Sequence, residues 1–175
     1  MVNEIAGFAI SVKGLTKTYS SKANGTKVAV AGIDLEVKSG EIFAILGPNG
    51  AGKTTTVEIL EGYRDRDGGE VKVLGHDPAK LGNESWSWRN RIGIVLQSTN
   101  DSQDLSVSET VKHFANYYSN SRNPDSVIRE VGLDEKKDAR IESLSGGQRR
   151  RLDVALGIIG NPEILFLDEP TTGFD

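Results

Sequence analysis

The sequence predicts an α/β fold with a mixed core sheet, an antiparallel β flank at the N-terminus and an inserted helical subdomain. Three observations lead to this class. The first third alternates between apolar and polar residues, three runs are continuously apolar, and the stretch from Ser98 to Gly160 has helical periodicity. Alternation is typical of half-buried antiparallel strands, whereas continuous apolar runs are typical of parallel strands that are covered on both faces.

Apolar residues spaced by two mark the expected antiparallel flank. They are Phe8, Ile10, Val12, Val28, Val30, Ile33, Leu35 and Val37, and the segment from Glu70 to Leu74 alternates in the same way. Asn24-Gly25 and Asp67-Gly68-Gly69 have the composition of tight turns. We therefore expect antiparallel strands joined by turns in this part of the chain.

The core of the sheet is predicted from the continuously apolar runs. These are Ile42 to Leu46, Ile92 to Leu96 and Ile164 to Leu167. Each has the length of a buried parallel strand. The segment from Thr54 to Glu61 follows the first run and is predicted to be helical.

Two helix faces define the inserted helical subdomain. Val107, Val111, Phe114, Ala115 and Tyr118 mark one face, and Leu152, Ala155, Leu156 and Ile159 mark the other. Pro124 and the charged stretch from Asp134 to Arg140 fall between these two predicted helices. Among the lesser features, Trp86 and Trp88 are interpreted as surface or packing residues, and the arginines 149–151 as a solvated helix start.

Composition narrows the class of protein. The 175 residues are 37% hydrophobic and 26% charged, and the formal net charge is −4. A weakly acidic chain has no general attraction for nucleic acid or anionic lipid. Cysteine is absent, which excludes disulfides and thiolate metal sites and favours a reducing cytoplasm. No run approaches the roughly 20 apolar residues of a membrane span.

A glycine-rich segment carries the first functional motif. Its residues are Gly47, Pro48, Asn49, Gly50, Ala51, Gly52, Lys53 and Thr54, and they match G-x-x-x-x-G-K-[ST] at every fixed position. In this motif backbone N–H groups and a helix N-terminus bind phosphate oxygens, Lys53 reaches the β- and γ-phosphates, and the Thr54 hydroxyl binds Mg²⁺. Thr55 is a further phosphate-binding candidate. The alternative is an ordinary glycine-rich turn with an exposed lysine.

Two acids follow the last apolar run. Asp168 and Glu169 come directly after the predicted strand from Ile164 to Leu167. The carboxyl end of a parallel strand faces the crevice where ligands bind, so Asp168 is a candidate Mg²⁺ ligand. Glu169 is a candidate for orienting or deprotonating an attacking water. The alternative is an acidic strand end before Pro170.

Leu144-Ser145-Gly146-Gly147-Gln148 opens the second predicted helix. Ser145 and Gln148 have the spacing of a capping box. Two successive glycines are poor helix formers, but they leave bare N–H groups at a positive helix end, which suits a phosphate.

This last segment resembles the signature motif of ABC ATPases, and the resemblance extends along nearly the whole chain. The segment from Gly47 to Thr54 resembles their Walker A loop, and the segment from Ile164 to Glu169 resembles their Walker B strand. Gln97 resembles the Q-loop glutamine that touches Mg²⁺. Tyr19 resembles the aromatic residue that stacks on adenine, and Gly173-Phe174-Asp175 resembles the start of the D-loop.

The resemblance implies a P-loop NTPase fold that uses ATP and Mg²⁺. Lys53, Gln97 and Glu169 would be its catalytic residues, and Thr54, Gln97 and Asp168 would hold the metal. Residues 1–97 and 161–175 would form the nucleotide-binding core, and residues 98–160 would form the helical signature subdomain. The segments Gly52 to Thr56, Glu58 to Gly62 and Thr171 to Asp175 are together most similar to those of bacterial drug- and antibiotic-export ATPases.

The resemblance also implies partners. Two such modules would pair head to tail, so that Ser145, Gly146, Gly147 and Gln148 of one bind the ATP held by the other. A membrane permease subunit would be the second partner, which implies a cytoplasmic protein at the inner face of the cell membrane. Nucleic acid is not an expected partner.

Two alternatives remain open. A soluble ABC ATPase acting on nucleic acid or ribosomes is one, and a nucleotide-binding but catalytically incomplete fragment is the other. Family members continue past the D-loop to a histidine that contacts the γ-phosphate, whereas this sequence ends at Asp175. Neither His76 nor His113 matches that histidine, so we expect weak turnover from these 175 residues alone.

Overall fold

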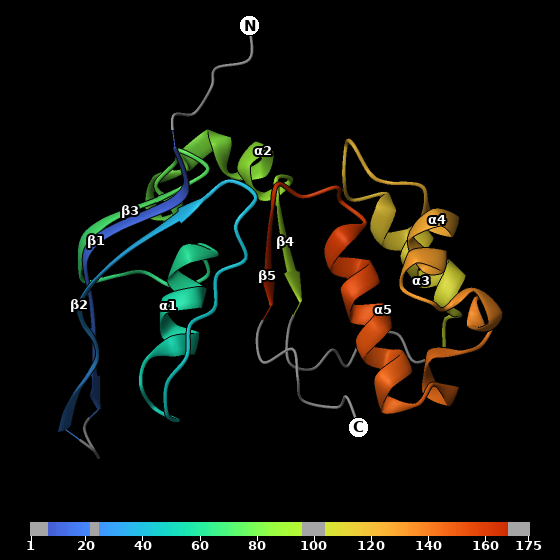
Figure 1. Cartoon of the computed structure of the whole chain (residues 1–175), viewed down its shortest axis with the longest axis horizontal. Helices are drawn as coiled ribbons and strands as arrows, with labels where there is room; N and C mark the ends of the chain where they lie inside the picture. Colours follow the sequence, from blue (N-terminus) through green and yellow to red (C-terminus); the bar gives the residue numbers. More distant parts are fainter. Residues whose placement is uncertain (1–6, 22–24, 96–103, 168–175) are drawn as a thin grey trace, which may run out of the picture. The chain divides into compact units, whose positions relative to one another are not determined.

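The computed structural model describes residues 7–21, 25–95 and 104–167. The chain divides into two compact units, residues 1–85 and 86–175, whose elements are labelled in Figure 1. Each unit is described in turn.

The first unit contains a three-stranded antiparallel sheet in the order β2-β1-β3. Its strands are β1 (Phe8–Ser21), β2 (Gly25–Lys38) and β3 (Gly68–Val73). One face is apolar because side chains alternate along each strand. The buried members of that face are Ile10, Val12, Leu15, Val30, Val37, Val71 and Val73. The predicted antiparallel flank is confirmed, although the turn at Asn24 lies outside the described residues.

Helix α1 (Lys53–Leu60) packs against this sheet through β2 and β3. It buries Thr56, Ile59 and Leu60. The predicted helix from Thr54 to Glu61 is therefore confirmed within one residue at each end.

The predicted buried strand from Ile42 to Leu46 is wrong for the structure as described. Residues 41–48 have no regular secondary structure, and Ile42 and Leu46 are 99% and 88% exposed. A strand buried on both faces needs hydrogen-bonded neighbours and covering layers. Neither sheet of the described residues contains this segment, so it has no strand partner in either of them.

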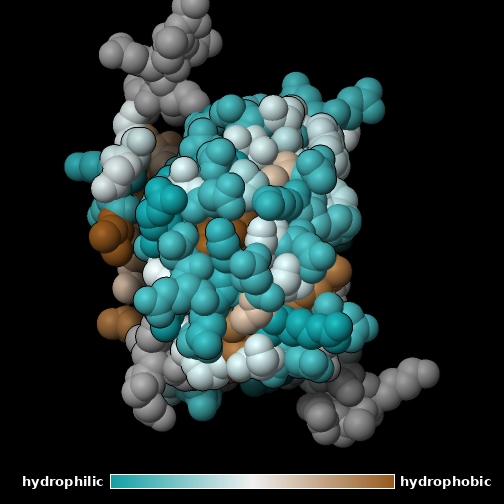
Figure 2. All heavy atoms as spheres, turned by 90° about the vertical axis from the view of Figure 1, so that its right-hand side faces the viewer, coloured by the Kyte–Doolittle hydropathy of each residue, from teal (hydrophilic) through white to brown (hydrophobic). Residues whose placement is uncertain are grey.

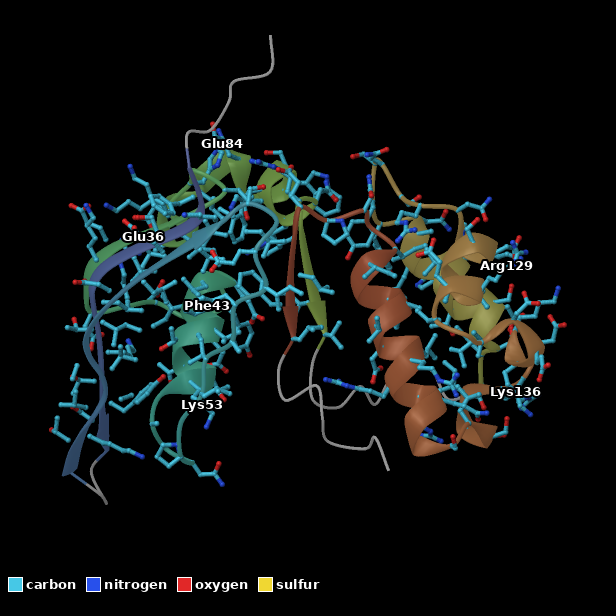
Figure 3. All side chains as sticks on the ribbon, viewed as in Figure 1. Glu36, Phe43, Lys53, Glu84, Arg129 and Lys136 are labelled. Atoms are coloured by element: carbon cyan, nitrogen blue, oxygen red, sulfur yellow. The ribbon has the colours of Figure 1, made fainter. Side chains whose placement is uncertain are left out.

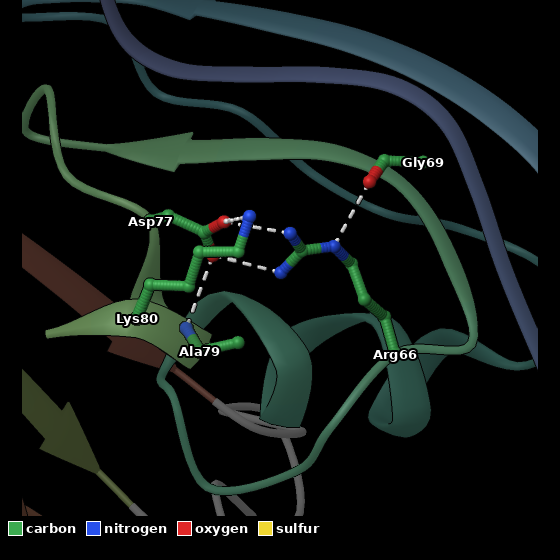
Figure 4. A network of polar contacts seen from close by, with 5 residues as sticks. All are labelled: Arg66, Gly69, Asp77, Ala79 and Lys80. Atoms are coloured by element: carbon green, nitrogen blue, oxygen red, sulfur yellow. Dashed lines mark hydrogen bonds and ion pairs between the residues drawn. The ribbon is translucent and has the colours of Figure 1, made fainter.

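A network of polar contacts joins the segment before β3 to the 3₁₀ turn that follows β3 (Figure 4). The guanidinium of Arg66 donates to both carboxylate oxygens of Asp77 at 2.7 Å, and its Nε donates to the carbonyl of Gly69 at 3.0 Å. Asp77 also caps the 3₁₀ turn Pro78–Lys80 through the N–H of Ala79. The bidentate contact with Arg66 lowers the pKa of Asp77.

The second unit contains a parallel pair of strands, β4 (Ile92–Val95) and β5 (Ile164–Leu167). Both were predicted from continuous apolar runs, and both are confirmed over these bounds. Gly93 and Gly157 allow close packing here, since a Cβ on Gly93 would overlap the Gly157 carbonyl. Helix α2 (Ser85–Arg89) precedes β4 and buries Trp88, whereas Trp86 is exposed.

Three further helices form the remainder of this unit: α3 (Val107–Ala115), α4 (Pro124–Glu130) and α5 (Gly146–Ile158). They share an apolar core to which each contributes. Its buried members are Val107, Val111, Ala115, Val127, Ile128, Leu133, Ile141, Leu144, Leu152, Ala155 and Ile159. The two predicted helix faces are confirmed. The face that carries these helices is mostly hydrophilic outside, with small apolar patches (Figure 2).

Two predictions in this unit need correction. Helix α4 lies where the sequence predicts only the region between two helices. Pro124 is its first residue, after an Asn123 side chain that accepts from the N–H of Ser126. Arg150 was interpreted as a solvated residue, but it is buried. The side chain of Asp153 lies 4.0 Å from it, one helical turn on.

Short 3₁₀ turns complete the described elements, at Gly82–Glu84, Asp134–Lys136 and Ile141–Ser143. Among the described residues no helix is both long and apolar enough to cross a membrane.

Candidate nucleotide-binding site

The glycine-rich loop before α1 adopts a backbone that only glycine adopts readily. Gly50 and Gly52 have φ angles of +83° and +85°, in the left-handed region that is strained for other residues. A Cβ on Gly52 would also overlap the carbonyl oxygen of Ala29 in β2. The loop therefore lies directly against the sheet, and this contact fixes where α1 begins.

The start of α1 is open to an acceptor. Its N-cap is Gly52, which has no side chain to bond the first-turn N–H groups, and the helix dipole makes this end positive. Lys53 is the first helical residue (Figure 3). Its ammonium donates to the carbonyls of Gly47 and Pro48 at 2.8 and 3.0 Å. These two hydrogen bonds hold the positive charge of Lys53 next to the start of the loop.

Three successive threonines at the start of α1 have different surroundings. Thr54 is exposed, whereas Thr56 is buried and donates its hydroxyl to the carbonyl of Gly52 at 2.9 Å. Thr55 lies between these extremes, and its hydroxyl is 3.3 Å from that of Tyr19. Thr56 is therefore used in packing, and Thr54 has the accessible hydroxyl that a metal ligand needs.

Tyr19 lies close to the loop, as a base-stacking residue would. Its hydroxyl contacts Thr55, and cations lie near its ring: the guanidinium carbon of Arg64 at 5.4 Å and the ammonium of Lys17 at 5.7 Å from the ring centroid. The structure thus brings together Tyr19, Lys53, Thr54 and Thr55 in one unit.

Sequence reasoning missed two cations here, Arg64 and Lys27. The ammonium of Lys27 is 3.7 Å from the place that a Cβ on Gly50 would take. Lys27 reaches the loop because it pairs with Tyr19 across the β1–β2 ladder. Strand register brings Lys27 to the loop, and Arg64 lies in the irregular segment after α1, so no sequence motif marked either cation.

These groups fit a polyphosphate. The loop offers first-turn N–H groups without a side-chain cap, and the ammonium groups of Lys53 and nearby Lys27. Each of these groups is a hydrogen-bond donor, and the two ammonium groups are also cationic. Successive backbone donors with a lysine at the helix start form an anion cradle, and the adjacent tyrosine ring adds an aromatic face.

The second glycine-rich helix start is also confirmed as a capping box. The Ser145 hydroxyl accepts from the N–H of Gln148 at 3.3 Å, and the Gln148 side chain accepts from the N–H of Ser145 at 2.9 Å. Gly146 and Gly147 are the first residues of α5. A Cβ on Gly146 would meet nothing within 4 Å, so the space on that side of the helix start is open.

The predicted acidic site lies outside the described residues, since Gln97, Asp168 and Glu169 are not among them. The strands that lead to them are described. In the parallel β4–β5 pair Val95 is opposite Leu167, so the strand ends that precede Gln97 and Asp168 are neighbours. Within the described part of the chain, no cluster of three or more acidic or histidine side chains is placed to hold a metal.

Both histidines have local partners. The Nδ1 of His76 is 2.9 Å from the carbonyl oxygen of Leu74, and its Nε2 is 3.4 Å from Glu84. His113 lies on α3, where its Nε2 is 3.0 Å from the hydroxyl of Tyr117.

A glycine-lined loop against a sheet, a lysine at the first helical residue and a tethered tyrosine together define the class of P-loop nucleotide-binding domains. The sequence profile described as "ABC transporter" matches residues 30–172. The chain therefore belongs to the ABC transporter family.

Curated relatives agree with this assignment. The chain is 38% identical over 174 residues to "Nod factor export ATP-binding protein I" of Ralstonia nicotianae, covering 95% of this chain and 51% of the relative. It is 41% identical over 172 residues to "Daunorubicin/doxorubicin resistance ATP-binding protein DrrA" of Streptomyces peucetius, covering 95% and 50%. The chain thus spans about half the length of the curated relatives it matches.

Solved structures support the fold. The chain is similar to the ATP-binding cassette MJ0796 in a dimeric post-hydrolysis state bound to ADP and Pi, with a TM-score of 0.82 and 27% identity, covering 95% of this chain and 76% of that one. A further dimeric structure of MJ0796, described as a bacterial ABC transporter cassette, gives a TM-score of 0.80 at 26% identity. The predicted ABC-type α/β fold is confirmed.

Proposed function

We propose that this chain is the ATP-binding and ATP-hydrolysing part of a subunit that energises an ABC-type exporter of drugs, antibiotics or other hydrophobic compounds. The observation that carries the proposal is the open start of α1, where Lys53 spans a loop whose glycines lie against β2. The relatives support export, because their names are those of Nod factor export and daunorubicin resistance proteins.

The triphosphate of ATP would bind to the loop from Gly47 to Thr55. The first-turn amides of α1 would donate to its oxygens, and Lys53 would exchange the carbonyls of Gly47 and Pro48 for phosphate oxygens. That exchange is favourable because a phosphate oxygen carries a formal negative charge and a carbonyl does not. The ring of Tyr19 would stack on adenine, with its hydroxyl held by Thr55.

Mg²⁺ would be held by Thr54, Gln97 and Asp168, and it would supply neutralisation of the phosphate charge. Glu169 would orient the attacking water and accept its proton. Thr54 suits this role because its side chain is exposed, unlike that of Thr56. The proposed division places these residues in a nucleotide-binding core of residues 1–97 and 161–175, with residues 98–160 as the helical signature subdomain.

A second copy would complete the site. Ser145, Gly146, Gly147 and Gln148 would bind the γ-phosphate held by the partner's loop, and the space before Gly146 is open for this. The dimeric state of the similar MJ0796 cassette supports the arrangement. ATP between two faces would favour the closed dimer, since it binds that state with more contacts. A membrane permease would be the other partner, with this chain at the inner face of the cell membrane.

The test is dimerisation of a hydrolysis-blocked variant. With Glu169→Gln, ATP should convert the monomer to a dimer, as measured by light scattering coupled to gel filtration, whereas ADP should not. Glu169→Gln combined with Gly146→Asp should stay monomeric, because the added carboxylate would face the phosphate. That substitution leaves the fold intact, since Gly146 has open space around it. A Glu169→Gln variant that stays monomeric with ATP would contradict the two-copy site.

A further inference from the structure

The segment from Tyr63 to Asp67, which connects α1 to β3, is held at several points although it has no regular structure. The N–H groups of Tyr63 and Arg64 both donate to the carbonyl of Glu58, at 2.9 and 3.1 Å. The Nε of Arg64 donates to the carboxylate of Glu58. These contacts fix Arg64 to the last turns of α1.

The far end of the segment is fixed as firmly. Arg66 makes the bidentate contact with Asp77 (Figure 4). Asp67 accepts from the ammonium of Lys17 at 2.8 Å and from the N–H of Thr18 at 2.6 Å, which ties the segment to β1 directly before Tyr19. The position of Arg64 relative to Tyr19 is therefore set by contacts on both sides of the segment.

Tyr19 is held in two ways as a result. Its hydroxyl contacts Thr55, and its ring lies beneath the guanidinium of Arg64 at 5.4 Å. A cation over an aromatic ring is attracted to its face. Loss of Arg64 would leave the ring held at its hydroxyl and by the more distant ammonium of Lys17, and so freer to turn about its χ angles.

The cations near the ring are each paired with a carboxylate, Arg64 with Glu58 and Lys17 with Asp67. Their charges are largely neutralised locally, so they add little attraction for a distant phosphate. An effect of Arg64 on nucleotide binding should consequently act through the ring, and so through the base.

We propose that Arg64 is a positioning residue for base recognition: it holds the ring of Tyr19 in the orientation in which a purine stacks on it. This inference rests on the proposed function, because it takes Tyr19 as the residue that meets adenine. Arg64 itself need not touch the nucleotide.

The experiment compares two ligands that share the phosphates and differ in the base. ATP and inorganic tripolyphosphate are titrated by calorimetry into the protein and into Arg64→Ala. The variant should bind ATP roughly two- to fivefold more weakly, the range of an exposed cation–π contact, and should bind tripolyphosphate as before. Arg129→Ala is the control, since it removes the same charge from an exposed position on α4 (Figure 3).

A double-mutant cycle distinguishes two roles of Arg64: orienting the ring of Tyr19, and stabilising helix α1 in general. In a Tyr19→Leu protein, Arg64→Ala should not lower the ATP affinity further. In a protein that keeps Tyr19, Arg64→Lys should lower the ATP affinity less than Arg64→Ala does, because lysine keeps a cation. Equal weakening of both ligands, an undiminished effect in Tyr19→Leu, or tighter ATP binding by Arg64→Ala would each overturn the inference. If the unmodified protein bound neither ligand, the proposed function would fail instead.

Discussion

Two of the described helices, α1 and α5, have glycine at the N-terminal end, and they are capped differently. Helix α1 starts after Gly52, which provides no cap, and its first residue is a lysine whose ammonium crosses the loop. Helix α5 starts after Ser145, whose hydroxyl and the Gln148 side chain satisfy each other's N–H groups. The first turn of α1 has no side-chain cap, and that of α5 is capped by its own side chains.

This difference predicts which of the two helix starts binds the phosphates first. The first-turn N–H groups of α1 have no side-chain cap, so an anion can bind to them without displacing a capping group. At α5 the Ser145 hydroxyl already accepts a hydrogen bond, so its remaining lone pair and its proton are what a ligand meets. Binding at α1 should therefore be the stronger and earlier contact, with α5 added by a partner.

The largest expected effect comes from a pair of glycine substitutions, one at each helix start. Gly52→Ala should lower the free energy of unfolding by about 2–4 kcal/mol, because it combines a strained φ angle with overlap of the Ala29 carbonyl. Gly146→Ala should leave it unchanged or raise it by less than about 1 kcal/mol, because alanine is the better helix former and the space is open. Urea denaturation followed by circular dichroism measures both. Equal effects would mean that the two starts do not differ.

The next effect concerns the cap that only α5 has. Ser145→Ala should cost about 1 kcal/mol, because the N–H of Gln148 loses its acceptor. Ser119→Ala, at an exposed turn position outside the helices, should cost little. The same denaturation experiment measures the difference. A Ser145→Ala variant as stable as the Ser119→Ala control would show that the capping box does not stabilise this helix.

An effect of similar size, but dependent on pH, is expected for the ion pair between Arg66 and Asp77. Asp77→Asn should lower the stability by about 1 kcal/mol at pH 7, since it weakens the bidentate contact with Arg66. The pKa of Asp77 is lowered by Arg66 in the folded state. The ionised carboxylate of Asp77 therefore stabilises the fold fully above its pKa in the unfolded chain, which is near 4. This stabilisation is lost as the pH falls through the lower pKa of the folded protein.

The gap between the Asp77→Asn variant and the unmodified protein should consequently narrow as the pH falls below about 4. Thermal unfolding at a series of pH values measures it. A gap that stayed constant, or that widened in acid, would mean that the carboxylate charge does not stabilise the fold.

The sequence predicted most elements where the pattern reflects local surroundings. Alternation identified β1, β2 and β3, and helical periodicity identified α3 and α5, because each buries one face within its own unit. The motif spacing likewise predicted the loop before Lys53 and the capping box at Ser145.

The failures have physical causes. Ile42 to Leu46 has the composition of a buried strand, but burial depends on neighbours that a local pattern does not show, and Phe43 is half exposed (Figure 3). Helix α4 was missed because proline both interrupts helices and begins them. Lys27 was missed because its place near the loop depends on strand register, and Arg64 because its place depends on the bend after α1 and its ion pair with Glu58.

The most direct test is the affinity of Lys53→Ala for ATP. Its ammonium is the charge that the open start of α1 holds in place, and a hydrogen bond from a charged group contributes about 1.5–3 kcal/mol. Calorimetric titration should thus give an affinity at least about tenfold lower than that of the unmodified protein, whereas Lys136→Ala, in the exposed 3₁₀ turn of the second unit, should bind as before. Unchanged ATP affinity in Lys53→Ala would contradict the account.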